Sequence, residues 1–132
     1  MQWTNDLSVG VEAIDNQHKE LIRRMNSFFD SMNTDNQGKV LEMLAFLSDY
    51  VVRHFKDEEA LQIKYNYPGY SDHRKIHQDF MKDVQRMKDD INSHGFTVAT
   101  KSLVGLTLTN WLTLHINRED KAVGRYVRSK QA

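Results

Sequence analysis

The spacing of apolar residues is the feature that most restricts how this chain can fold. Apolar side chains recur every three or four residues along most of the chain, and proline occurs once, at Pro68. A repeat near 3.6 residues is typical of amphipathic α-helices, and scarce proline leaves long helices uninterrupted. We find no strand-like alternation, internal repeat or low-complexity tract in the sequence. The pattern therefore predicts an all-α protein.

Short polar breaks divide the pattern into helical segments. The expected helices are 11–33, a second that ends near 64, 71–93 and 98–117, with a short terminal helix around 123–127. The break at residues 33–36 supplies a stop and a new N-cap, and the turn at 65–69 contains the proline. Ser71 is expected to cap the third helix. Similar helix lengths and short connections predict an antiparallel up-down-up-down four-helix bundle. We expect one domain over residues 1–132, with an N-terminal arm and a short C-terminal helix.

Composition excludes several classes of function. The chain has 18 basic and 18 acidic side chains, so its formal net charge is zero. It therefore has no excess of basic residues that would indicate a nucleic-acid or membrane partner. It has no cysteine, which excludes disulfides, thiolate metal sites and iron–sulfur clusters. The N-terminal residues do not resemble a signal peptide, and no segment approaches the roughly 18 apolar residues needed to span a bilayer. We therefore expect a cytoplasmic location.

Histidines and carboxylates are spaced so that they can meet in the core of such a bundle. The candidate metal ligands are His18, His54, Glu58, His73, His77, His115 and Asp120. Residues four apart lie about 40° apart around a helix, so each pair with this spacing shares a face. One isolated histidine is usually a surface residue or a hydrogen-bonded core residue. The occurrence of donors on all four amphipathic segments favours a metal site instead.

His115 and Asp120 are five residues apart, which is about 140° around a regular helix. For both to reach one site, the sequence predicts a π-bulge or a helix end between them. Glu59 and His94 are interpreted as non-ligands. The five-residue offset from His54 turns Glu59 away, so it is expected to be solvated, and His94 lies in a break beside a glycine.

The number of donors exceeds what one metal ion needs. Five imidazoles and two carboxylates are too many for a four-coordinate zinc ion, and they suit two ions bridged by the carboxylates. Because five is odd, three histidines are expected on one ion and two on the other, which leaves the second ion one open position. Imidazole and carboxylate ligands suit iron among the available metals. A structural zinc bundle is the alternative.

The chain strongly resembles the hemerythrins, in particular the single-domain bacterial hemerythrins. The resemblance covers essentially the whole chain and includes the segment 10–21, the seven candidate ligands, Trp111 and Trp3. It implies two iron ions bridged by Glu58, Asp120 and an oxo or hydroxo group. It further implies that His73, His77 and His115 hold the saturated iron and that His18 and His54 hold the open one. The implied function is reversible dioxygen binding for transport, storage or delivery.

Four apolar residues match those around the oxygen pocket of the family: Leu21, Phe55, Trp111 and Ile116. Periodicity alone would place them in an ordinary core, and both interpretations can hold together. The alternatives to a carrier are an oxygen or redox sensor, or a di-iron oxidase, peroxidase-like or nitric-oxide-handling enzyme. No residue outside the ligand set forms a recognisable nucleophile or acid–base pair, so we expect no catalytic residues and no enzyme. The sequence names no protein that would accept the oxygen.

Overall fold

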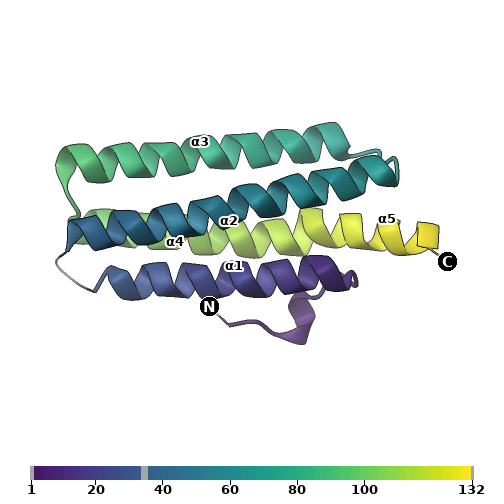
Figure 1. Cartoon of the computed structure of the whole chain (residues 1–132), viewed down its shortest axis with the longest axis horizontal. Helices are drawn as coiled ribbons and strands as arrows, with labels where there is room; N and C mark the ends of the chain where they lie inside the picture. The colour runs from purple at the N-terminus through teal and green to yellow at the C-terminus, as the bar shows by residue number, and fades with distance from the viewer. Residues whose placement is uncertain (1, 34–35, 132) are drawn as a thin grey trace.

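The protein is a bundle of four long helices in a computed structural model that describes residues 2–33 and 36–131 (Figure 1). The elements are a 3₁₀ turn η1 (Asn5–Leu7), α1 (Glu12–Ser31), α2 (Gln37–Lys64), α3 (Tyr70–His94), α4 (Val98–His115), the π-turn η2 (Ile116–Asp120) and α5 (Lys121–Gln131). No strand occurs within these described ranges. The predicted all-α, up-down-up-down bundle is therefore confirmed.

The helix ends follow local capping chemistry. The Asn36 side chain accepts a hydrogen bond from the Lys39 backbone N–H at 3.0 Å and begins α2. The Thr97 hydroxyl accepts a hydrogen bond from the Thr100 N–H at 3.1 Å and begins α4. The expectation that Ser71 caps the third helix was wrong, because α3 already begins after Gly69. Thr34 and Asp35, in the first predicted break, lie outside the described residues.

The fourth helix, α4, ends at His115, close to the expected end near residue 117. The chain then passes through η2 and continues as α5, so that the two helices are nearly collinear in Figure 1. The prediction of a π-bulge or helix end between His115 and Asp120 is confirmed, because Ile116–Asp120 is a π-turn. The terminal helix is also longer than expected, at 11 residues.

The core of the bundle is apolar and closely packed, and it extends to the arm before α1. Its fully buried members include Phe28, Leu44 and Ile116. In the arm, Leu7 and Val9 are buried against the bundle. The Val9 N–H donates to Asp15 Oδ1 at 2.8 Å, which ties the arm to the start of α1.

None of the helices in the described part of the chain is long and apolar enough to cross a bilayer.

Candidate metal centre

All seven predicted ligand side chains point into one region of the core. His18 comes from α1, His54 and Glu58 from α2, His73 and His77 from α3, His115 from the end of α4, and Asp120 from the end of η2. Each of these residues is at most 3% exposed. A π-turn closes after about five residues, so it returns Asp120 to the face of the helix that carries His115. The seven donors therefore meet despite their irregular spacing in the sequence.

Three histidines form the first group. His115 Nε2 lies 3.2 Å from His73 Nε2 and 3.1 Å from His77 Nε2. Two nitrogens about 2.1 Å from one ion and at right angles to each other would be about 3.0 Å apart. The spacing of the three nitrogens thus fits neighbouring positions around one metal ion. It fits poorly with direct hydrogen bonds alone, because each neutral imidazole has only one N–H to donate.

The other two histidines form the second group. His18 Nε2 lies 2.8 Å from Asp120 Oδ2, and His54 Nε2 lies 3.5 Å from Glu58 Oε2. The ligand atoms of His18, His54, Glu58 and Asp120 all lie within 4.8 Å of one another. These four donors could surround a second ion.

Glu58 and Asp120 are common to both groups. The Oε1 atom of Glu58 lies 2.6 Å from His73 Nε2, while its Oε2 atom faces His54. The Oδ1 atom of Asp120 lies 3.0 Å from His115 Nε2, while its Oδ2 atom faces His18. Each carboxylate therefore directs one oxygen toward each histidine group, which is what a residue shared by two metal ions would have to do.

Several buried polar atoms in the cluster lack a hydrogen bond. Both oxygens of Glu58, Oδ1 of Asp120 and Nε2 of His54 have no hydrogen-bond partner among the described residues. Such groups are costly to bury without compensation. All four are atoms that would ligate a metal ion, so two cations would satisfy them together.

The pKa shifts within the cluster also favour positive charge between the two acidic side chains. Burial raises the pKa of Glu58 well above its usual value, and the charge of Asp120 raises it further. Burial opposes a charge on His73, but the nearby carboxylates of Asp120 and Glu58 raise its pKa to about 9. Burial and the charges of His115 and His73 lower the pKa of His77 to about 2. Positive charge is therefore favoured at His73, beside the two acidic side chains, while His77 stays neutral.

Side chains that contact the Nδ1 atoms, on the side of each ring away from the cluster, orient several of the imidazoles. His54 Nδ1 donates to Gln17 Oε1 at 2.7 Å, and Gln62 lies against His73 Nδ1 at 3.1 Å. His77 Nδ1 lies 2.9 Å from Glu59 Oε2. The expectation that Glu59 is solvated was therefore wrong, since its side chain is only 20% exposed and pairs with a candidate ligand. Sequence spacing correctly kept Glu59 out of the cluster, but only the packing of α2 against α3 shows its partner.

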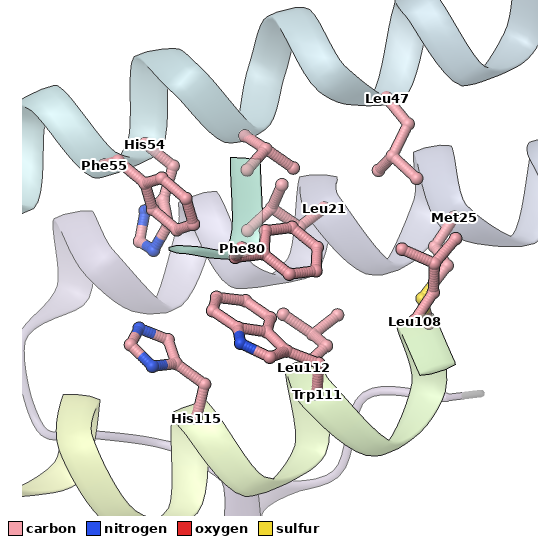
Figure 2. Close-up of a pocket in the computed structure, with 11 residues that line it drawn as sticks. Leu21, Met25, Leu47, His54, Phe55, Phe80, Leu108, Trp111, Leu112 and His115 are labelled. Carbon is pink, nitrogen blue, oxygen red and sulfur yellow. The ribbon is translucent and has the colours of Figure 1, made fainter. Parts of the chain in front are cut away.

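Aromatic side chains pack directly on two of these imidazoles. The Phe55 ring stacks on His77 with centroids 3.8 Å apart, and the Trp111 ring stacks on His115 at 4.4 Å. Phe80 also stacks on the Trp111 indole, at 3.7 Å. Figure 2 shows Phe55, Phe80 and Trp111 beside His54 and His115. The stacking limits how far the imidazoles can rotate.

An apolar cavity of about 20 Å³ adjoins the cluster (Figure 2). Its lining residues are Leu21, Met25, Leu47, Val51, His54, Phe55, Phe80, Leu108, Trp111, Leu112 and His115. A cavity of roughly 10–15 Å³ already holds one water-sized molecule, so this one has room for a diatomic molecule. Leu21, Phe55 and Trp111 were expected at such a pocket. Ile116 is buried but is not among the lining residues, and Phe80 lines the cavity although it was not predicted there.

His94, the histidine that was excluded as a ligand, is exposed at the end of α3 and belongs to neither donor group.

Comparison with known proteins gives one consistent result. A family model described as "Hemerythrin HHE cation binding domain" matches residues 9–127. The bacteriohemerythrin of Pseudomonas aeruginosa strain LESB58 is 33% identical over 118 residues, covering 89% of this chain and 75% of that protein. The myohemerythrin of Theromyzon tessulatum is 28% identical over 119 residues, covering 90% and 87%. A crystal structure of wild-type hemerythrin matches with a TM-score of 0.84 at 28% identity, covering 96% of this chain and 97% of that one.

Proposed function

Because the chain belongs to the hemerythrin family, as its sequence predicted, we propose that it binds dioxygen reversibly at a non-haem di-iron centre. Family membership together with the histidine and carboxylate cluster supports a non-haem iron, oxygen-binding domain. The finer role that we propose is that of an oxygen carrier, in transport, storage or delivery. The observation that carries the proposal is the pair of carboxylates, each of which directs one oxygen toward each histidine group.

We assign the donors according to the two groups. His73, His77 and His115 would hold one iron and His18 and His54 the other, with Glu58, Asp120 and an oxo or hydroxo group shared between them. When bound, a ferrous pair supplies the two electrons that reversible dioxygen binding requires. Because the histidines divide unequally, the iron held by two imidazoles would have fewer ligands. A small ligand would therefore have room on that iron.

The cavity adjoins both groups, through His54 of the pair and His115 of the three, so a small ligand in it would lie beside the cluster. His54 forms part of the cavity wall, and every other lining residue except His115 is apolar. Such a wall excludes water and provides no proton donor close to a bound ligand, which favours binding over further reduction. Phe55 and Trp111 also keep two imidazoles in place by stacking on them.

The same cavity argues against an enzyme that oxidises an organic substrate. Its lining residues include no carboxylate, hydroxyl or thiol, and its volume of about 20 Å³ admits only a very small molecule. We therefore propose binding rather than catalysis. A single domain over residues 1–132, a cytoplasmic location and the lack of nucleic-acid or membrane partners remain predictions from the sequence.

An optical experiment tests the proposal. The iron-loaded protein is reduced without oxygen, exposed to oxygen and then returned to an oxygen-free atmosphere. A charge-transfer spectrum that appears with oxygen and disappears on its removal, over repeated cycles, is the expected result. Irreversible conversion with release of peroxide would instead indicate an oxidase. Failure to take up two iron equivalents per chain would refute the di-iron centre.

A further inference from the structure

The residues behind the imidazoles differ in charge between the two histidine groups. In the group of three, His77 Nδ1 lies 2.9 Å from a Glu59 carboxylate oxygen, and Glu119 Oε2 lies 3.7 Å from His115 Nδ1. In the group of two, His54 Nδ1 donates to the neutral amide of Gln17 at 2.7 Å. His18 Nδ1 has no hydrogen-bond partner in the described part of the chain. The direct negative neighbours thus belong to one group only.

The direction of the imidazole rings determines what Glu59 can do. The His77 Nε2 atom faces His115 and Glu58 inside the cluster, so a metal ion would bind there. The single proton of the neutral ring must then reside on Nδ1, where it is donated to Glu59. Donation to a carboxylate makes an imidazole a stronger electron donor than donation to an amide does.

The Glu59 carboxylate has two partners, the His77 ring and a cation. It follows Glu58 directly in α2, but it points toward the groove between α2 and α3 rather than into the core. Its second oxygen lies 3.7 Å from the exposed Arg74 Nε, so the carboxylate lies between a cation and an imidazole. A negative charge in this position favours the higher oxidation state of an ion on the far side of His77.

We infer that Glu59 is a positioning residue which, by accepting the His77 Nδ1 proton, lowers the reduction potential of the iron in the group of three histidines. The inference rests on the proposed di-iron function. Its consequence is an uneven pair of irons, in which the one held by three histidines gives up its electron more readily. That is useful for an oxygen-binding site, because the ion without direct contact with the ligand must also be oxidised.

The test exchanges the charges behind the imidazoles and measures the reduction potential by spectroelectrochemistry. Glu59→Gln keeps a hydrogen-bond acceptor for His77 but removes the charge. We expect it to increase the ratio of ferrous to ferric iron about tenfold at a fixed applied potential, which corresponds to a shift of about 59 mV for one electron. Circular dichroism and iron content confirm that the variant is folded and loaded.

A reciprocal variant moves a carboxylate to the other group without changing the net charge. Gln17 Nε2 donates to Asp57 Oδ2 at 2.7 Å, so Gln17→Glu combined with Asp57→Asn keeps a hydrogen-bonded pair and places the charge on His54. This variant should lower the reduction potential of the iron held by His18 and His54, because a carboxylate would then accept the His54 Nδ1 proton. Glu42→Gln is the control for loss of one charge, because Glu42 is 67% exposed and precedes Glu58 by 16 residues, or about 24 Å along α2.

Two results would separate this inference from the proposed function. If Glu59→Gln shifts the potential no more than Glu42→Gln does, the positioning role of Glu59 is refuted even if oxygen binding remains reversible. If the parent protein holds two irons but does not bind oxygen reversibly, the proposed function fails, and the comparison of potentials still decides the role of Glu59.

Discussion

Gly124 in α5 provides a sharp test of how the N-terminal arm packs. A Cβ atom added at this glycine would lie 2.0 Å from the carbonyl oxygen of Val9 and 2.9 Å from its carbonyl carbon. Both are backbone atoms, so no flexible side chain can move aside to relieve the overlap. The Gly124→Ala substitution must therefore displace the arm or shift α5.

The magnitude follows from two opposing terms. Alanine is favoured over glycine within a helix by about 0.8–1.0 kcal/mol. Against this, displacement of the arm exposes Leu7 and Val9, which are 8% and 3% exposed in the folded protein. Full exposure of two such side chains costs about 3–6 kcal/mol. We therefore expect Gly124→Ala to lower the free energy of unfolding by about 2–5 kcal/mol.

Gly105 in α4 is the matched control. A Cβ atom there would meet only Met32 Cε, at an ordinary contact distance of 3.9 Å. Gly105→Ala should therefore stabilise the protein by up to about 1 kcal/mol. Urea unfolding of both variants and the parent, at equal iron content, measures the difference. If Gly124→Ala is as stabilising as Gly105→Ala, the arm does not pack against α5 as described.

Three further predictions concern the metal cluster and the surface. Glu58→Ala should weaken iron binding at least about tenfold, because Glu58 is shared by both donor groups, and elemental analysis that still finds two irons per chain would contradict this. Trp111→Ala should accelerate autoxidation of the oxygenated protein by opening the cavity wall, and an unchanged half-life would remove that role. Hydrogen bonds from Arg23 and then Arg24 lower the pKa of Glu20 from 4.5 to about 2. Since this folded-state pKa is depressed, the stabilisation is present above pH 4.5 and is lost as the pH falls toward 2, so urea unfolding of Glu20→Gln should show a weaker acid dependence over this range.

Much of the fold could be predicted from local patterns. The period of the apolar residues determines which face of each helix is buried, and short connections leave an antiparallel bundle as the simple way to bury those faces. The pairs His54–Glu58 and His73–His77 could be recognised because residues four apart share a helix face. The five-residue spacing of His115 and Asp120 also indicated a π-bulge or a helix end, since no regular helix would bring both to one site.

Other features depend on contacts between segments that are distant in the sequence. Glu59 is an exposed position by helix periodicity, yet the packing of α3 beside α2 places its carboxylate on His77. Phe80 joins the cavity wall because α3 brings it against Trp111. Spacing along one helix determines which side chains share a face, whereas only the tertiary structure determines which neighbouring helix that face meets. The sequence alone therefore determined the helices and the donor set. The packing of the helices decided the rest: the cavity, the side chains that contact the Nδ1 atoms of the imidazoles, and the close contact of the N-terminal arm with Gly124.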